Sequence, residues 1–277
     1  MRGKHAGSVL IDGKKITKLN TKTPETVSNF VYMYWHPNGN YLAATVCDTY
    51  QNFFINNPNT LEVLDHNSDI VIYDVKKNEV FSCEALNSKD AWQIFPAFSP
   101  DGKSLYFSST AAVDSISKNF RQMTSLCRVD FDPETRTLGQ QVDTLYNGRA
   151  NHKSVSFPRI SPDGKYLLYS SSKENITQRP FSLSSLFQVN LETLAVDTLF
   201  FEDRFLGGAS YSPDGKQLLL TASPEAFDGI GKNCGNHPIA NDFDSQAFIM
   251  DLATRKIDPI TKEFNPSVNF LQWNKGD

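Results

Sequence analysis

Residues suited to metal sites and disulfides are scarce in this sequence. Its 277 residues include only four cysteines and five histidines. The cysteines are far apart and form no CxxC pair, so buried free thiols are expected rather than disulfides. No two histidines have the spacing of metal ligands, and neither a metal nor another cofactor is expected. The residues concerned are Cys47, Cys83, Cys127, Cys234, His5, His36, His66, His152 and His237.

Long apolar runs and an excess of positive charge are also missing. No run approaches the roughly 18 apolar residues of a membrane-spanning helix. Residues 1–15 lack the apolar core of a signal peptide. The 31 acidic residues outnumber the 27 basic ones, which gives a net charge of −4 and a pI near 5.8. A mildly acidic surface argues against binding nucleic acid or anionic membranes.

No segment shows a sustained helical period. The chain is instead rich in aromatic residues, with 20 Phe and 10 Tyr, and these favour strands. Its length suffices for one large or two modest domains with a substantial core. The composition therefore points to an all-β protein.

A turn motif repeats along the chain. Three segments have nearly the same sequence, FSPDGKSLYFSS (98–109), ISPDGKYLLYSSS (160–172) and YSPDGKQLLLTAS (211–223), and WHPNGNYLAATV (35–46) is a looser match. Pro presets φ, Asp accepts hydrogen bonds from the turn backbone, and Gly tolerates the conformation that closes the turn. The apolar residues that open these turns, and one more near the end, are 63, 62, 51 and 62 residues apart. They are Trp35, Phe98, Ile160, Tyr211 and Trp273.

A second series has nearly the same period. Hydrophobic strands end in Asp or Asn at intervals of 62, 56, 60 and 61 residues, and each is followed by a polar turn and another strand. The residues are Asp12, Asp74, Asp130, Asn190 and Asp251. Four antiparallel strands repeated about every 60 residues are typical of the blades of a β-propeller.

The two series divide the chain into blades of one propeller domain over 1–277. Four blades are predicted at about 29–87, 88–147, 148–203 and 204–263. A fifth, split blade would combine 264–277 with 1–22. A fragment of a six- to eight-bladed ring fits the repeats about as well.

The repeat resembles that of known propeller families. The segments AWQIFPAFSPDGKSLYFSS and SVSFPRISPDGKYLLYSSS, within residues 88–172, resemble the repeat of TolB-like propeller proteins. Residues 205–273 look like the propeller domain of prolyl oligopeptidase or dipeptidyl peptidase-type serine peptidases. The TolB resemblance implies a location in the periplasm or cell envelope of a bacterium. In the peptidase family the catalytic triad lies in a separate hydrolase domain, and this sequence has neither that domain nor a GxSxG motif.

The recurring acids are expected to be turn acceptors rather than a ring of functional carboxylates. Asp101, Asp163 and Asp214 belong to the repeated turn, and the acids of the second series begin outer turns. Two inserts, 54–67 and 223–246, are candidate rim loops where binding residues concentrate. The second carries Asp228, Asp242 and Asp244, too few acids at the alternating spacing of a calcium loop.

The innermost strands of a propeller line its central channel. The residue before each turn-opening residue varies and includes large polar side chains, as a binding channel requires; the five are Tyr34, Ala97, Arg159, Ser210 and Gln272. Trp92 begins another inner strand, while Phe95 and its equivalent Phe157 are expected to pack between blades. The candidate ligand contacts are Tyr34, Trp92, Arg159 and Gln272, with Arg159 the first choice in a mildly acidic protein.

Three functions remain open on this evidence. The first is a non-catalytic monomer that presents its channel and rim loops to a protein, peptide or glycan. The second is the substrate-gating propeller of a prolyl oligopeptidase-type peptidase, without the hydrolase domain. The third is a propeller lyase or hydrolase with a metal in the channel. The lack of a catalytic constellation in the sequence favours the first.

Overall fold

The computed structural model describes most of the chain as strands and tight turns, with one short 3-10 turn, η1 (Glu84–Leu86). The described residues contain no helix long and apolar enough to cross a membrane. They divide between two compact units, the first formed by Met1–Tyr50, Leu64–Lys118 and Leu126–Leu145, and the second by the rest. The described residues are 9–12, 14–18, 30–53, 61–112, 123–151, 154–172, 178–179, 184–203, 205–227, 245–261, 268 and 271–274.

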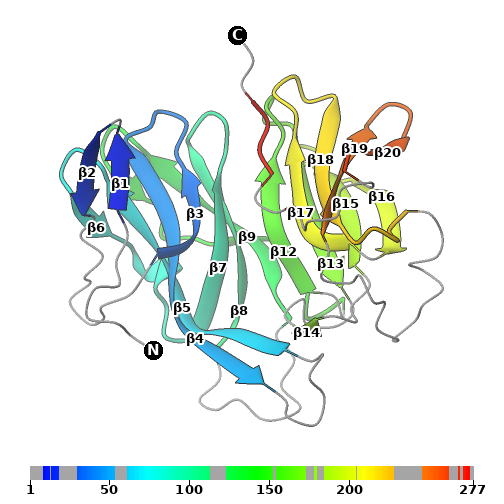
Figure 1. The fold of residues 1–277 in the computed structure, drawn as a ribbon. Helices are drawn as coiled ribbons and strands as arrows, with labels where there is room; N and C mark the ends of the chain where they lie inside the picture. The colour runs from blue at the N-terminus through cyan, green and yellow to red at the C-terminus, as the bar shows by residue number, and fades with distance from the viewer. Residues whose placement is uncertain are drawn as a thin grey trace. The chain divides into compact units, whose positions relative to one another are not determined.

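The first unit holds a hairpin and most of two antiparallel sheets, while residues 51–53 and 61–63 of the first sheet belong to the second unit (Figure 1). Blade 1 consists of β3 (Phe30–Trp35), β4 (Tyr41–Phe53), β5 (Leu61–Asp74) and β6 (Glu79–Phe81). Blade 2 consists of β7 (Ala91–Phe98), β8 (Ser104–Ala111), β9 (Ser125–Asp132), β10 (Thr137–Leu138) and β11 (Asp143–Tyr146). The hairpin of β1 (Val9–Asp12) and β2 (Lys15–Lys18) packs through Leu10 against the core of blade 1.

The second unit repeats this plan. Blade 3 consists of β12 (Ser154–Ile160), β13 (Tyr166–Ser172), β15 (Ser184–Asn190) and β16 (Val196–Asp203). Blade 4 consists of β17 (Phe205–Tyr211), β18 (Gln217–Ala222), β19 (Gln246–Asp251) and β20 (Ile257–Pro259). The prediction of an all-β fold made of four-stranded antiparallel blades is confirmed.

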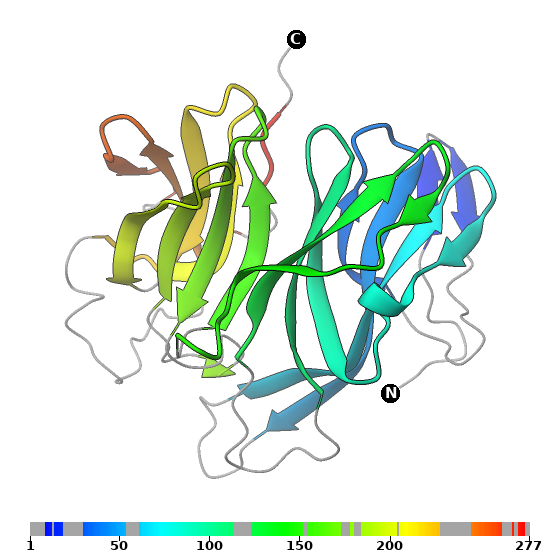
Figure 2. The same ribbon diagram turned by 180° about the vertical axis from the view of Figure 1, so that it is seen from behind.

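Blade 1 differs from the others in its length. β4 has 13 residues and β5 has 14, against six in β3, so the two strands extend beyond β3 as a ribbon (Figures 1 and 2). Within the second unit, to which residues 61–63 belong, two residues of a blade 3 insert, β14 (Gln178–Arg179), pair with Leu61 and Glu62 at the start of β5. Residues 61–67 therefore belong to a strand, and their prediction as part of a rim loop is wrong.

The core of each unit lies between its two blades. In the first unit Ile70 and Ile72 of blade 1 pack with Phe107 and Val129 of blade 2. In the second unit a similar cluster joins Leu186 to residues of blade 4. Each fully buried aliphatic or aromatic side chain contributes about 1.5–3 kcal/mol, so the alternation of apolar residues along the strands provides the main stabilisation.

The repeated turn has the hydrogen bonds that its sequence predicts. In blade 2 the Ser99 hydroxyl donates to Asp101 Oδ1 at 2.5 Å, and the same oxygen accepts the Lys103 N–H at 3.0 Å. Gly102 closes the turn with a φ of 72°. Blades 3 and 4 repeat these contacts with Asp163 and Asp214. The serine hydroxyl, followed by the backbone N–H, lowers the pKa of each carboxyl group below its usual value.

The outer turns show that one residue of the second series, Asp130, was predicted wrongly as a turn acceptor. In blade 2 the turn is capped by Asp132, whose carboxylate accepts hydrogen bonds from the backbone and hydroxyl of Thr135. Asp251 makes the same contacts with Thr254 in blade 4. Asp130, which the sequence analysis took as the turn acid, lies two residues earlier within β9 and is exposed.

Every inner strand contains a bulge that the sequence did not reveal. In blades 1 to 3 the strand register shifts three residues before the turn-opening residue, and in blade 4 it shifts between Phe205 and Gly208. In three blades the bulged residue is aromatic and has a positive φ: Tyr32 at 50°, Phe95 at 59° and Phe157 at 54°. The rings of Tyr32 and Phe95 meet edge to face with centroids 4.5 Å apart. The bulges of blades 1 and 2 thus bring the side chains of Tyr32 and Phe95 together, and each positive φ has a conformational cost of about 1–3 kcal/mol.

Several sequence predictions lie outside the described residues. These are Cys234, three of the histidines (His5, His152 and His237), the side chain of His66, the acids of the 223–246 insert, and most of the residues of the predicted split blade. Cys127 is a buried free thiol, as expected, whereas Cys83 is a free thiol that is only half-buried, and Cys47 is also half-buried. Burial raises the pKa of Cys127 to about 11.

Candidate functional site

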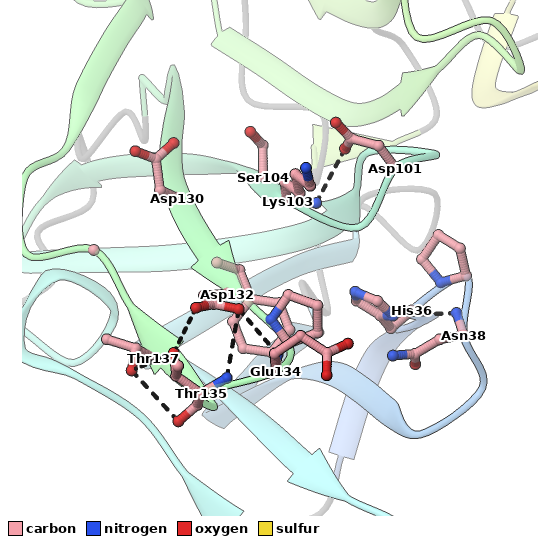
Figure 3. A pocket seen from close by; sticks show the side chains of 14 residues that line it. His36, Asn38, Asp101, Lys103, Ser104, Asp130, Asp132, Glu134, Thr135 and Thr137 are labelled. Atoms are coloured by element: carbon pink, nitrogen blue, oxygen red, sulfur yellow. Dashed lines mark hydrogen bonds between the residues drawn. The ribbon is translucent and has the colours of Figure 1, made fainter.

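A groove of about 1110 Å³ lies in the first unit, between the turns of blades 1 and 2 (Figure 3). The turn of blade 1 forms one wall, and the turn of blade 2 together with the β9–β10 hairpin forms the others. We call it the first-unit groove. The residues that line it are His36, Pro37, Asn38, Asp101, Lys103, Ser104, Asp130, Phe131, Asp132, Pro133, Glu134, Thr135, Thr137 and Gly139.

His36 fixes the two turns to each other. It stands where the other blades have serine, and it is 4% exposed. Its Nδ1 accepts the Asn38 N–H at 3.2 Å, so its Nε2 carries the proton and donates to Gly102 O at 2.9 Å. The ring also meets Phe98 and Phe131 edge to face. Both ring nitrogens are occupied within the protein, so His36 supports the groove and has no nitrogen to offer to a metal ion.

The carboxylates of the groove fall into two groups. Asp101 and Asp132 are held by the turn hydrogen bonds described above. The hydroxyl of Thr135, followed by the Glu134 N–H, lowers the pKa of Asp132. The side-chain carboxylates of Asp130 and Glu134 receive no hydrogen bond and form no ion pair among the described residues. In Figure 3, Asp130 lies apart from the hydrogen-bonded group around Asp132.

The charge of the lining is strongly negative. Four carboxylates face one ammonium group, that of Lys103, which leaves a net formal charge of −3 with His36 neutral. Prolines 37 and 133 provide apolar surface between the charges. Among the described residues, no group of three histidine, cysteine or acidic side chains could hold a metal ion. The arrangement is suited to contact with a cationic or mixed polar surface.

The second unit has an equivalent groove of about 690 Å³, between the turns of blades 3 and 4. Its lining includes Tyr166 and Tyr211, and the Tyr211 hydroxyl accepts a hydrogen bond from Gln188 Nε2 at 2.7 Å. Burial raises the pKa of Tyr211. The position of a groove beside each pair of turns thus follows from the repeat, whereas its charge differs from one unit to the other.

Matching the two capped outer turns shows where the charge differs. Asp132 and Asp251 make the same turn contacts, and each is followed four residues later by an arginine with a φ near 60°, Arg136 at 61° and Arg255 at 62°. Counting from these anchors, Asp130 corresponds to Ile249 and Glu134 to Ala253. The two carboxylates without partners are therefore specific to the first-unit groove.

The four channel candidates from the sequence lie elsewhere. Tyr34 packs against the core of the first unit, and Trp92, in β7, is 3% exposed. In the second unit, Arg159 Nη1 donates to the carbonyl of Pro158 at 2.9 Å, and Gln272 is exposed. None of the four lines either groove, and their role in binding stays a prediction.

Sequence reasoning missed the groove because it treated each turn alone. A signal was nevertheless present. The outer turn FDPETRT is more acidic than its counterpart MDLATRK, and His36 replaces the serine of the repeat. His36 has a packing role in the fold, whereas the extra acid of the outer turn, Glu134, has none.

Comparison with known proteins bears on the fold only. No family model matches the sequence. No curated protein matches it. A structure from a study of two prolyl endopeptidases and the role of their inter-domain dynamics is similar to this chain, with a TM-score of 0.52 and 12% sequence identity. The similarity covers 90% of this chain and 31% of that one. A puromycin-hydrolysing peptidase from Mycobacterium tuberculosis gives a TM-score of 0.50 and 13% identity, over 92% of this chain and 31% of the peptidase.

TolB from Acinetobacter baumannii is also similar, with a TM-score of 0.47 and 17% identity, over 90% of this chain and 46% of that protein. The chain thus spans about a third to a half of these three proteins. With its four-stranded antiparallel blades and its similarity to the two peptidase structures, the chain has a β-propeller fold. The resemblance is to TolB and to the propeller domains of prolyl peptidases, as the turn motif predicted.

Proposed function

We propose that this chain is a non-catalytic binding protein whose first-unit groove holds a peptide segment of a partner protein. The observation that carries the proposal is the groove itself, about 1110 Å³ in volume and lined by Asp130 and Glu134, whose carboxylates have no partner among the described residues. Its volume is sufficient for several side chains of an extended segment. A propeller fold hosts many functions, so the proposal rests on this groove and not on the fold.

A substitution that fills the groove tests this function. Ser104 lines the groove at the first position of β8, and blade 3 has Tyr166 at the equivalent position, so Ser104→Tyr is compatible with the blade. The matched control is Gln217→Tyr at the equivalent position of blade 4. Peptides selected from a random display library on the wild-type chain are measured by calorimetry against both variants.

The expected result is that Ser104→Tyr weakens the binding of the selected peptides about tenfold or more, whereas Gln217→Tyr leaves it unchanged. Such a loss corresponds to about 1.4 kcal/mol, well within what blocking a pocket removes. Equal affinity of the selected peptides for wild type and Ser104→Tyr would show that the groove is not the binding site.

A second candidate function is the gating propeller of a prolyl oligopeptidase-type peptidase. It is supported by the two peptidase structures with TM-scores of 0.52 and 0.50, which this chain matches over 31% of their length. Sequencing the gene on both sides of the segment for residues 1–277 tests it. A hydrolase domain with a GxSxG motif in the same reading frame is the expected result, and a reading frame without one would exclude this function.

The cellular location follows from the TolB resemblance of the repeat and is part of the proposal. We expect the protein in the periplasm or at the cell envelope. Fractionation of the source cells, followed by detection with a specific antibody, distinguishes this from a cytosolic location.

A further inference from the structure

We propose that the first-unit groove selects a lysine- or arginine-bearing peptide segment, and that Asp130 and Glu134 are the residues that select it. This inference rests on the binding function proposed above and names its partner class. The evidence is a comparison of two grooves built from the same repeat within one chain.

The repeat explains part of the acidity of the groove but not all of it. Asp101 and Asp132 are turn acceptors, and the second-unit groove has the same kind of acids in Asp163, Asp214 and Asp251. Asp130 has no such role, because its side chain takes no part in the hydrogen bonds of the turn. Its counterpart is Ile249, which shows that the blade accommodates an apolar residue there.

The extra carboxylates flank Asp132 in the sequence and line the same groove. Asp130 and Asp132 are two residues apart in β9, so both point to the same, exposed face, while Phe131 between them is buried. Glu134 follows in the adjoining turn and adds a third carboxylate to the same stretch. The negative charge of this exposed stretch attracts a cationic side chain to the groove.

The geometry favours a cationic side chain over a metal ion. The described residues provide no cluster of three ligands for a metal. A lysine or arginine side chain can lay its apolar stem along Pro37 and Pro133 while its charged end reaches the carboxylates. Arginine can also bind one carboxylate through two parallel hydrogen bonds. Lys103, the cation already in the groove, limits how many further positive charges it can take.

Capped homotetrapeptides are the probes for this inference. We would titrate acetylated and amidated tetralysine, tetraglutamine and tetraglutamate into the intact chain at low salt, and follow the backbone amide signals of the groove by NMR. Tetralysine is expected to bind at least tenfold more tightly than tetraglutamine, and tetraglutamate not to bind. Raising the salt concentration should weaken the binding of tetralysine, because exposed charge pairs are screened.

A charge-matched pair of variants identifies the selecting residues. The variant Asp130→Asn with Glu134→Gln removes two negative charges from the groove. The control Asp90→Asn with Glu192→Gln removes two exposed charges that lie outside both grooves. The groove variant should bind tetralysine about three- to thirtyfold more weakly, the range expected for losing two exposed ion pairs, and the control should bind as wild type does.

The outcomes separate this inference from the proposed function. If tetraglutamine or tetraglutamate shifts the groove signals as strongly as tetralysine, or if both variants lose affinity equally, cation selectivity is refuted while a binding groove remains. If no tetrapeptide shifts these signals, the inference is also refuted, and the display experiment with Ser104→Tyr decides separately on the groove. Loss of affinity confined to the groove variant supports the assignment of Asp130 and Glu134.

Discussion

The contact between His36 and Gly102 allows a quantitative test of how the two turns are joined. Gly102 and Gly164 occupy the same position of the turn, with φ values of 72° and 75°. A Cβ at Gly164 would meet nothing within 4 Å, whereas a Cβ at Gly102 would collide with the His36 ring. The two glycines therefore share a backbone conformation and differ in their surroundings.

Replacing each glycine by alanine separates these two effects. Gly164→Ala should reduce the free energy of unfolding by about 1–2 kcal/mol, the cost of a left-handed conformation for a residue with a Cβ. Gly102→Ala should cost the same amount plus about 1–3 kcal/mol for displacing a ring that is 4% exposed and packed against Phe98 and Phe131. Urea denaturation monitored by tryptophan fluorescence measures both values.

A double variant identifies the source of the additional cost. In the presence of His36→Ser, which introduces the serine of the other blades, the collision with Gly102→Ala disappears. The coupling between the two substitutions should therefore be about 1–3 kcal/mol. Equal destabilisation by the two glycine substitutions, or additivity of Gly102→Ala with His36→Ser, would refute the packing described for this turn.

Three further predictions concern the charges and thiols of the fold. Because the folded pKa of Asp101 lies below its unfolded value of 3.8, this carboxylate stabilises the folded state above that pH. The free energy of unfolding should fall as the pH is lowered through the folded pKa, and Ser99→Ala should flatten this decline in a pH series of urea denaturations; an unchanged profile would contradict it. Arg136 Nε lies 3.3 Å from the buried carboxylate of Asp74, an ion pair without hydrogen-bond geometry. Arg136→Met should therefore lower the free energy of unfolding by about 2–4 kcal/mol, whereas Arg255→Met, at an exposed ion pair, should lower it by less than about 1 kcal/mol. Equal losses in urea denaturation would refute this. Finally, Cys127 is 3% exposed with a pKa raised to about 11, so peptide mapping should find it unmodified by iodoacetamide in the native protein at neutral pH and modified in urea; rapid native labelling would contradict its burial.

The fold was predictable because its information is local. Pro, Asp and Gly in the repeated turn each have a physical role that is independent of the rest of the chain, and the structure shows the hydrogen bonds expected of Asp101. The positive φ of Phe95 was not predictable in this way. It arises from a register shift between two strands, and its N–H is accepted by Thr45 Oγ1 of the preceding blade at 3.3 Å. A property that depends on a residue 50 positions away leaves no local signature.

The misassigned acid has a related cause. Asp130 and Asp132 both follow apolar residues, and Asp130 was predicted as the turn acid because it ends the hydrophobic segment LCRVD (126–130). In the structure the turn acid is Asp132, because only Asp132 lies three residues before a threonine whose hydroxyl and N–H can donate to it. The hydrogen-bonding pattern of the turn, rather than the end of the hydrophobic run, defines the equivalent residue in each blade.

This correction is also what makes the candidate site visible. Once Asp132 is matched to Asp251, Asp130 and Glu134 become departures from the repeat, and so does His36 when it is set against the turn serines. All three line the same groove, although they come from different blades and are up to 98 residues apart in the sequence. His36 joins the two turns of the groove, so the fold explains its presence, whereas the fold gives no role to the side chains of Asp130 and Glu134. That reasoning points to the first-unit groove rather than to the equivalent groove of the second unit as the place to look for a partner.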